Sequence, residues 1–577
     1  MDVIKSVQTY ITKMFGEVNG MKVLLLDADT TPIISMVMTQ SQLLSREVYL
    51  IDRADNKQRE KLRHLKCICF LRPTGESIQA LVEELREPCY GDYYLYFSNT
   101  LKKSALERLA EVDEQEVVRE VQEHYADFLA VNPDLFSLSL AAPADPIFSE
   151  NSATWDTRTL TRTAEGVLAA LLALKKKPLV RYEKTSVLGK KLAAEIVYQI
   201  QQEGPLFDFR RTDTPPILLV MDRRNDPVTP LLNQWTYQAM VHELIGIQNA
   251  RVDLSVVPDV RPELKEVVLS IDTDPFYKKN MFLNLGDLGM NIKTYVSEYQ
   301  SKHRSTQSIE SIADMKKFVE DYPEFRKLSG NVTKHVTLVG ELSRLVGKQG
   351  LMEIGELEQG LAVAENHAAD LKLLRQMIER TNIPEDSKVR LVLLYALRYE
   401  RSQSNSIGAL KELLLRSGVS EKKVGLVDLL LQYAGADQRV EDIFSNQDVF
   451  SRTKKVFEGL KGVENVYTQH TPRLVQVLQE MMKGKLKDQL YPFVEGGTRD
   501  KPQDIIVFMV GGATYAEARE VSKLNASTPG VRIILGGTTI HNSASFLREM
   551  SDSVARWTGK SSDTRSPLPE RLRTVRT

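Results

Sequence analysis

Cysteine is scarce in this 577-residue chain, which contains only Cys67, Cys69 and Cys89. So few cysteines cannot form a disulfide framework in a chain of this size, so we expect a reducing compartment such as the cytosol. Cys67 and Cys69 lie in an apolar run, where strand alternation puts both on one face. A zinc site would need further Cys or His ligands at a finger spacing, and none follows. We therefore expect buried strand thiols and no bound metal.

Long apolar runs and net charge are also lacking. No stretch approaches the roughly 20 apolar residues that cross a bilayer, and charges interrupt the apolar residues of segment 1–18, unlike a signal peptide. We therefore expect a cytoplasmic protein that does not span a membrane. Lys and Arg total 76 against 77 Asp and Glu, a net charge of -1. Because this balance gives no global basic field, we do not expect nucleic-acid binding.

The chain has enough apolar residues for several cores. Hydrophobic residues make up 42% of 577 residues, whereas a single core stops growing at roughly 250–300 residues. Short apolar runs alternate with helical patterns up to about residue 131, which predicts a doubly wound parallel sheet. The expected strands are 21–27, 48–52, 67–71 and 93–98, and the expected helices are 32–44, 77–85 and 101–109.

A second α/β domain is predicted in two pieces. Strand signals occur at 217–222, 504–510 and 531–535, but nearly vanish between 246 and 482, where helical periodicity dominates. A helical domain is therefore expected as an insertion. The predicted boundaries are 1–134 for the first α/β domain, 135–245 and 483–558 for the second, 246–482 for the helical domain, and 559–577 for a flexible tail rich in Pro, Ser and Arg.

The turn at Gly511 and Gly512 is the best candidate for a ligand-binding loop. Glycines there would let a phosphate approach backbone N–H groups at a helix N-terminus. No Gly-Lys-Ser/Thr follows, however, and no G-x-G-x-x-G occurs. A tight strand-to-helix turn explains the pair without a ligand. A nucleotide-binding transferase or hydrolase that uses this turn is the alternative function.

The loop after 217–222 combines charge with proline. Asp222 and Asp226 could bind a metal or act as acid and base. The neighbouring Arg223 and Arg224 can instead satisfy both carboxylates by charge-assisted hydrogen bonds. We favour a salt-bridged loop, including Pro230, that locks a domain junction. The histidines are scattered and no Gly-x-Ser-x-Gly elbow is present, so we expect neither catalytic residues nor a cofactor.

Several stretches resemble the Sec-one/Munc-eighteen-like (SM) family of SNARE chaperones. They are LLVMDRRNDPVTPLL at 218–232, WTYQAMVHEL at 235–244, VRLVLLYAL at 389–397 and FMVGGATYAEAR at 508–519. The segments 233–240, 246–249 and 274–284 are most similar to the vacuolar-protein-sorting branch, which serves the trans-Golgi network and endosomes. The resemblance covers the chain up to its tail.

The resemblance implies an arch-shaped three-domain protein with no enzymatic activity. Two doubly wound α/β domains are accompanied by a helical domain 3, divided into 3a (about 246–362) and 3b (about 363–482). The implied protein is a monomer that binds a syntaxin-type Qa-SNARE of the trans-Golgi network or endosomes and promotes vesicle fusion. Further implied partners are a SNARE bundle that includes a vesicle SNARE, and a tether or small-GTPase effector. It would reach Golgi and endosome membranes peripherally, through SNAREs.

Two sites on the first domain follow from the resemblance. A pocket for the N-terminal syntaxin peptide is expected within 116–128, a predicted helix that leads into a strand, where helical spacing puts Val118, Val121 and Tyr125 on one stripe flanked by Val117. Phe128 completes this pocket. The alternative is that the stripe is core, and for Val121 the two interpretations are equally favoured. A central SNARE cleft would use Arg53, Lys57, Arg59 and Arg63. The alternative is a solvated helix face, and Arg53, at a strand's carboxyl end, is the strongest candidate.

The third site is a helical hairpin in domain 3a, expected within 309–362. An apolar stripe is interrupted at Pro323, which should kink or end the helix. Pro323 is then either a switch in SNARE templating or a helix stop. The residues assigned to the hairpin are Ile312, Met315, Phe318, Val319, Pro323, Leu328 and Val332.

Overall fold

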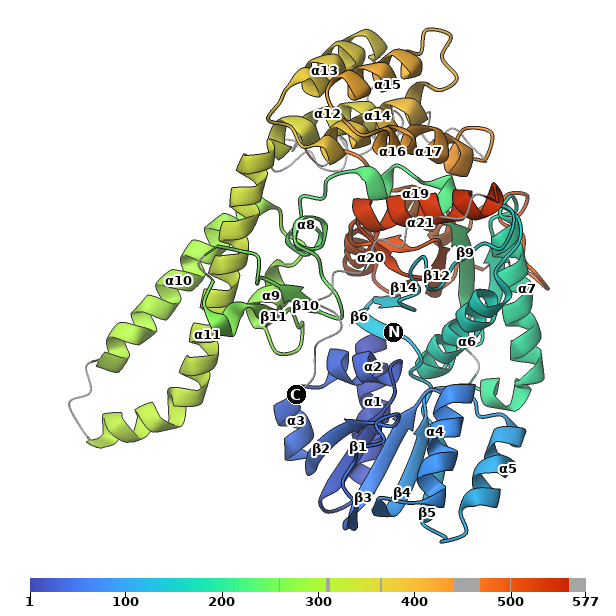
Figure 1. The fold of residues 1–577 in the computed structure, drawn as a ribbon, viewed down its shortest axis with the longest axis vertical. Coiled ribbons are helices and arrows are strands. Elements are labelled where there is room, and N and C mark those ends of the chain that lie inside the picture. The colour runs from blue at the N-terminus through green and yellow to red at the C-terminus, as the bar shows by residue number, and fades with distance from the viewer. Residues whose placement is uncertain are drawn as a thin grey trace.

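The computed structural model describes residues 1–577 except 211, 259, 308–311, 364–365, 440–443, 445–466, 468, 499 and 560–577. For 301–307 and 312–328 it describes the backbone alone. The predicted tail beyond Gly559 therefore lies outside the described residues. Figure 1 shows two sheets placed one above the other, a helical bundle beyond the second sheet, and a helical hairpin that projects to the left.

The N-terminal sheet has five parallel strands in the order β2-β1-β3-β4-β5. They are β1 (Lys22–Leu26), β2 (Val48–Arg53), β3 (Leu62–Leu71), β4 (Tyr90–Phe97) and β5 (Val118–Glu123). The helices are α1 (Val3–Glu17), α2 (Thr30–Val37), α3 (Gln40–Ser45), α4 (Gly75–Arg86) and α5 (Lys103–Val112). α4 and α5 share one core with alternate strand residues, and α1 and α2 share the core on the opposite face. This is the doubly wound arrangement that the strand and helix pattern predicts.

The helix predicted over 32–44 is divided into α2 and α3. Thr39 has extended backbone angles and its hydroxyl accepts from the Gln42 N–H, while the Gln42 side chain accepts from the Thr39 N–H. In one continuous helix the N–H groups of Thr39 and Gln42 would donate to carbonyls of the preceding turn. The capping box satisfies both N–H groups with side chains instead, so a new helix starts here. Cys67 and Cys69 are fully buried free thiols on one face of β3, with Sγ atoms 3.7 Å apart.

The second sheet joins two distant parts of the chain. Its six strands follow the order β6-β7-β14-β12-β9-β8. They are β6 (Leu129–Asn132), β7 (Leu135–Ser137), β8 (Leu179–Tyr182), β9 (Ile217–Asp222), β12 (Asp504–Val510) and β14 (Arg532–Gly537). β9 and β12 pair in parallel, with Ile217 beside Ile505. The helices packed on this sheet are α6 (Thr157–Leu174), α7 (Val187–Gln202), α20 (Tyr515–Ser527) and α21 (Ser543–Trp557), with a small pair β13 (Ala513–Thr514) and β15 (Ile540–His541) nearby.

Two elements pack with a different domain from the one to which the predicted boundaries assign them. β6 falls within 1–134 but pairs with β7 in the second sheet. α19 (Arg473–Met482) falls within the predicted helical domain, yet Leu474 and Leu478 pack in the core of the second sheet. The pattern of the sequence could not show this, because a short strand or an amphipathic helix looks the same whichever sheet it joins.

The region between the two halves is mostly helical. It begins with α8 (Tyr237–Leu244) and α9 (Pro275–Asn280), and a short antiparallel pair, β10 (Arg251–Asp253) and β11 (Glu266–Val268), precedes α9. The long helices α10 (Leu285–Gln307) and α11 (Ile312–Gln349) pack together as a hairpin, whose first helix lies before the range 309–362 in which the hairpin was expected. The bundle contains α12 (Leu351–Val363), α13 (His367–Glu379), α14 (Glu385–Tyr399), α15 (Ile407–Arg416), α16 (Glu421–Val424) and α17 (Leu426–Ala434). None of the helices in the described ranges has the length and hydropathy of a membrane span.

Candidate functional site

The predicted peptide pocket lies on a strand, not on a helix. Residues 118–123 form β5, the edge strand of the N-terminal sheet, and Glu116 has a left-handed φ of 51° just before it. β-branched valines favour a pleated, half-buried position beside β4 over a helix. The predicted helix within 116–128 is therefore wrong.

A bulge in β5 brings two of the predicted pocket residues to the same face. Val118 pairs with Tyr93, but Val121 pairs with Leu95, so one extra residue lies between them on β5. Residues paired in a parallel ladder share a face, and Tyr93 and Leu95 belong to the core beneath α4 and α5. Val118 and Val121 therefore both point to the α5 side. Val118 is half-buried and Val121 is 38% exposed.

The remaining predicted pocket residues lie elsewhere. Val117 and Phe128 are buried core residues. Tyr125 packs on the opposite side of the sheet, where its ring meets Tyr10 of α1 at 6.3 Å between centroids. The five residues thus do not line one pocket, because the alternation of a strand sends neighbours to opposite faces.

Sequence reasoning missed Leu106, which is 42% exposed on α5. Leu109 is the buried residue of α5, and Leu106 lies three residues before it with its side chain exposed. The Leu101 N–H donates to Glu123 Oε1 at 2.6 Å, which ties the entry to α5 to the end of β5. We call Val118, Val121 and Leu106 the β5–α5 face. It offers exposed apolar atoms beside the outer edge of β5, which pairs with no further strand in the described part of the chain.

The predicted cleft cations lie in and around the loop that joins β2 to β3, and not on a helix. Arg59 is buried with Glu84 as an ion pair and donates to the Arg53 carbonyl, so it stabilises the loop from inside. It is not available to a partner, which corrects its assignment. The other three remain exposed: Arg53 pairs with Asp55 at 2.8 Å, Lys57 with Glu83 at 3.2 Å, and Arg63 donates to Gln115 at 3.0 Å.

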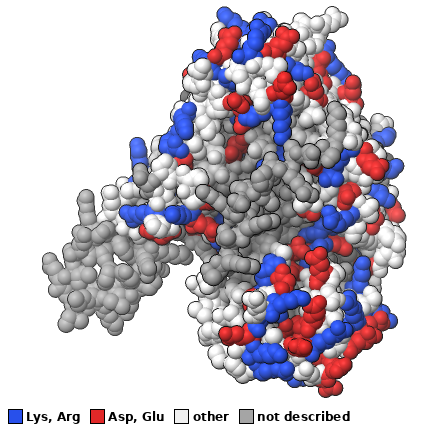
Figure 2. Space-filling view, viewed as in Figure 1, with Lys and Arg blue, Asp and Glu red and all other residues white. Residues whose placement is uncertain are grey.

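Next to Arg53, the edge strand β2 exposes apolar side chains that the sequence analysis did not assign. Tyr49, Leu50 and Ile51 are all exposed, although they follow one another along the strand. β2 is the second edge of the N-terminal sheet, so no strand of the described residues pairs with its outer backbone groups. On the face seen in Figure 2, Lys and Arg are interspersed with Asp and Glu over the N-terminal domain, so no single-sign patch dominates that face.

The hairpin is longer and more continuous than predicted. α11 runs through Pro323 from Ile312 to Gln349, so of the two predicted effects of Pro323, an end of the helix is wrong and a kink stays a prediction. An interior proline costs about 3 kcal/mol, which a long helix packed against α10 can absorb. Val332 is buried rather than available for exposure. The side chains of Ile312, Met315, Phe318, Val319, Pro323 and Leu328 lie outside the described residues.

The Asp222–Pro230 loop is the salt-bridged junction that was expected, with a different pairing. Arg224 donates to Asp222 at 2.9 Å, and although burial acts to raise the pKa of Asp222, Arg224 holds it below its ordinary value. Arg223 is fully buried and pairs at 2.5 Å with Glu517, not with the carboxylate of Asp226. Asp226 instead accepts from Thr229 and from the Arg473 N–H, and Pro230 is buried beside them. Both carboxylates are therefore satisfied within the protein.

Several donors around the turn at Gly511 and Gly512 are used within the protein, and the Gly512 N–H donates to the Met509 carbonyl at 3.3 Å. Both glycines have left-handed φ angles, +83° and +86°, and an added Cβ would lie 2.8 Å from Arg223 and 2.4 Å from His541. The Ala513 N–H donates to the Thr539 carbonyl. The Thr514 N–H donates to Glu517 in a capping box. These contacts favour a structural strand-to-helix turn over the nucleotide-binding alternative.

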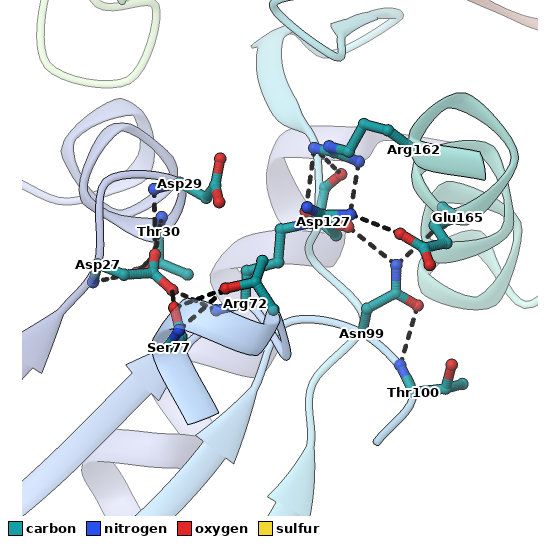
Figure 3. Close-up of polar contacts among 11 residues, drawn as sticks. Asp27, Asp29, Thr30, Arg72, Ser77, Asn99, Thr100, Asp127, Arg162 and Glu165 are labelled. Atoms are coloured by element: carbon teal, nitrogen blue, oxygen red, sulfur yellow. Dashed lines mark hydrogen bonds and ion pairs between the residues drawn. The ribbon is translucent and has the colours of Figure 1, made fainter. Parts of the chain in front are cut away.

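At the carboxyl ends of the N-terminal strands, where doubly wound sheets bind ligands, an ion-pair cluster lies beside a cavity of about 390 Å³ whose lining includes Asp29, Arg72 and Arg162. Figure 3 shows Asp127, which follows β5, between Arg72 and Arg162. Its Oδ2 accepts from Arg72 Nε at 3.1 Å and from Asn99 Nδ2 at 2.9 Å.

Arg72 also pairs with Glu165 of α6 at 2.5 Å, so this cluster docks the N-terminal domain onto the second one. Sequence reasoning did not single it out. The sequence signal that could have identified this cluster was a polar residue at the carboxyl end of each of the N-terminal strands that contribute to it. Within the described parts of the chain, no group of three His, Cys, Asp or Glu side chains is placed to hold a metal.

Comparison with known proteins assigns the chain to a family. The sequence matches the Sec1 family over residues 22–549. This chain belongs to the Sec1 family. Among its relatives, vacuolar protein sorting-associated protein 45 of Rattus norvegicus is 52% identical over 553 residues, 95% of this chain and 96% of that protein. The Schizosaccharomyces pombe protein of the same name is 48% identical over 556 residues, 95% and 99% of the two chains.

Solved structures of Sec1-family proteins share the fold. The SM protein Vps45 in complex with the Qa SNARE Tlg2 has a TM-score of 0.91 and 55% identity, covering 97% of this chain and 99% of that one. A structure of the SM protein Vps45 has a TM-score of 0.87 and 52% identity, with coverages of 96% and 98%. The predicted SM family and its α/β fold with a helical insertion are confirmed.

Proposed function

We propose that this Sec1-family protein is a non-catalytic SNARE chaperone. It binds a syntaxin-type Qa-SNARE, regulates SNARE complex assembly and promotes fusion in transport from the trans-Golgi network and endosomes to the vacuole or lysosome. The observation that carries the proposal is the similarity, over 97% of the chain, to a Vps45 structure whose partner is the Qa SNARE Tlg2. The protein acts from the cytoplasm and reaches these membranes peripherally, through its SNARE partners.

The β5–α5 face suits the N-terminal peptide of the Qa-SNARE. Val121 and Leu106 expose apolar atoms beside the outer edge of β5, and an extended peptide can use both features. The exposed residues of β2, together with Arg53, suit the helical SNARE motif. The α10–α11 hairpin offers a second helical surface for the bundle, including a vesicle SNARE.

The peptide site is tested with Val121→Arg and a matched control, Val187→Arg. Both valines are exposed, 38% and 53%, but Val187 lies at the start of α7 in the second domain. Burial of a valine side chain contributes about 1.5–3 kcal/mol, so Val121→Arg should weaken binding to the cytoplasmic domain of an endosomal syntaxin by at least about tenfold. Val187→Arg should leave it unchanged.

Isothermal calorimetry with full-length and N-terminally truncated syntaxin locates the effect. Val121→Arg should affect the full-length syntaxin and not the truncated one. An equal loss for both would refute the β5–α5 face as the peptide site, and no binding of either syntaxin to the wild-type protein would refute the proposed function.

The cleft is tested by Arg53→Glu, with Arg401→Glu as the control. Each arginine is exposed and pairs with a nearby aspartate, but Arg401 lies in the bundle. Charges at the rim of an interface mainly alter the association rate and its salt dependence. We expect Arg53→Glu to slow association in stopped-flow measurements at low salt. Identical rates for the two variants would count against the cleft assignment.

A further inference from the structure

A buried polar cluster joins the longer helix of the α10–α11 hairpin to the body of the protein, in addition to a hydrogen bond from Asn291 of α10 to Asn280 of α9. Asp274 lies at the N-cap of α9, where its Oδ1 accepts from the Tyr277 N–H at 2.9 Å. Its Oδ2 accepts from His335 Nε2 at 2.7 Å and forms an ion pair with Lys334. Lys334 and His335 are consecutive residues of α11. Asp274 thus connects a cap of the body to the middle of the hairpin's longer helix.

The cluster continues from α11 to α8. His335 Nδ1 lies 2.8 Å from the Tyr237 hydroxyl, and Tyr237 is the first residue of α8. A neutral imidazole satisfies both contacts, because Nε2–H donates to Asp274 while Nδ1 accepts from the Tyr237 O–H. Burial lowers the pKa of His335, which favours this neutral form although Asp274 acts in the opposite direction.

A second bond on the same helix strengthens the attachment. The Lys334 ammonium also donates to the Val268 carbonyl of β11 at 3.0 Å. Asp274 and His335 are 1% and 0% exposed, so these bonds are shielded from water. A buried ion pair with additional hydrogen bonds holds its partners in one geometry. Removing one partner leaves the other buried without a counter-charge. The cluster therefore specifies one orientation of α11.

A change in the angle of α11 at the cluster would move the far end of that helix. Lys334 comes 22 residues after Ile312, where α11 begins. At 1.5 Å per residue, this part of the helix is a lever of about 33 Å. A tilt of about 10° at the cluster would therefore move the far end of α11 by about 6 Å. Displacement of that size would separate a hairpin surface from a helix packed on it, since interaxial distances are about 8–10 Å.

We propose that Asp274 is the positioning residue that sets the direction of the α10–α11 hairpin, and through it the alignment of SNARE helices on the hairpin. The consequence for SNARE helices rests on the proposed function, whereas the direction of the hairpin does not. Apolar contacts of α11, including the buried Leu338 and Leu342, hold the helix to the protein without this cluster. Loss of Asp274 should therefore change the orientation of the hairpin and leave its helices folded.

The test uses Asp274→Asn, because asparagine caps a helix as well as aspartate does and removes only the charge. The matched control is Asp156→Asn, at the N-cap of α6, where Asp156 accepts from the Thr159 N–H at 3.0 Å and forms no ion pair given by the structure. Spin labels at Gln300 on α10 and Tyr198 on α7, both exposed, report the orientation of the hairpin. They are placed in the full chain with Cys89 replaced by serine.

We expect Asp274→Asn to broaden the distance distribution between the two labels and to weaken binding of an assembled SNARE bundle by about tenfold. Affinity for the N-terminal syntaxin peptide should not change, and Asp156→Asn should match the wild type in all three measurements. If Asp274→Asn does not fold, Tyr237→Phe, which removes one hydroxyl, is judged by the same criteria.

An unaltered distance distribution would overturn the positioning role. A broadened distribution with unchanged bundle affinity would overturn its link to SNARE alignment. Failure of the wild-type protein to bind any SNARE would instead refute the proposed function, and the distance measurement would still decide the orientation of the hairpin.

Discussion

Replacing Arg223 by methionine should strongly destabilise the second α/β domain, and replacing Glu517 by glutamine should then restore part of the loss. The two side chains form an ion pair with no solvent exposure on either side. Arg223 also donates to the carbonyls of Gly512 and Asp226. It thereby connects the end of β9 to the turn before α20. The methionine variant removes the charge and these donors, and leaves the Glu517 carboxylate in the core.

The expected magnitudes follow from the burial of the pair. Breaking a buried ion pair by removing one partner costs about 3–5 kcal/mol, because the remaining charge has lost its partner. Burial already raises the pKa of Glu517, and Arg223 opposes that shift. Glutamine at 517 removes the unpaired charge and can still complete the capping box with Thr514. The double variant should therefore be more stable than Arg223→Met alone, by about 1–3 kcal/mol.

Thermal unfolding of the four proteins of this cycle, followed by tryptophan fluorescence, measures the coupling. For a domain of 150–250 residues, 1 kcal/mol corresponds to about 2–4 °C. Arg223→Met should thus lower the midpoint by roughly 6–20 °C, and the added Glu517→Gln should raise it again. If the two substitutions lower the midpoint additively, the pair is not coupled and the reasoning fails.

Three further outcomes are expected. Gly536→Ala should lower the unfolding midpoint by the equivalent of about 1–3 kcal/mol, because the new Cβ would lie 2.1 Å from the Phe136 ring. Adding Phe136→Leu should recover part of the lost stability, and no recovery would contradict the clash. Asp127→Asn should lower the unfolding midpoint more than Asp437→Asn, because Asp127 pairs with two arginines within the protein whereas Asp437 is exposed. Equal midpoints for the two variants would count against a role of the Asp127 cluster in docking the two domains. Burial lowers the pKa of His242 to about 4, so the unfolded chain binds a proton below about pH 6.5 that the folded protein does not. Stability should therefore fall as the pH drops from 6.5 towards 4, with a loss of about 2 kcal/mol reached at pH 5. His242→Gln should flatten the decline in midpoint between pH 7 and pH 5, and an unchanged slope would refute the assignment.

The error over β5 shows what periodicity alone cannot resolve. Val118, Val121 and Tyr125 fit a helical stripe, yet a strand with one bulge also brings Val118 and Val121 to one face. The two readings differ in where Tyr125 points, and only pairing with β4 decides it. A short segment takes the structure that its neighbour can hydrogen-bond, because tertiary context overrides weak local preference.

Pro323 and Arg59 show the same limit for single residues. A proline predicts a helix stop from local sterics, but α11 continues through it in a hairpin packed over many residues. Arg59 belongs to an exposed-looking charge run, but its partner Glu84 lies on α4, 25 residues away. Neither outcome could be calculated from nearby residues, since the deciding contacts come from other elements.

The amino-acid sequence by itself determined the alternation of strands and helices, the helical insertion and the near-neutral charge. These properties depend on neighbours within a few residues, and β9 and β12 match their predicted bounds for that reason. Tertiary structure alone decided which sheet β6 joined, which arginines were buried, and where the Asp127 and Asp274 clusters formed. Asp274 meets His335 across 61 residues and Arg223 meets Glu517 across 294. Buried polar groups must find partners wherever the packed chain supplies them, so these sites exist only after the elements have docked.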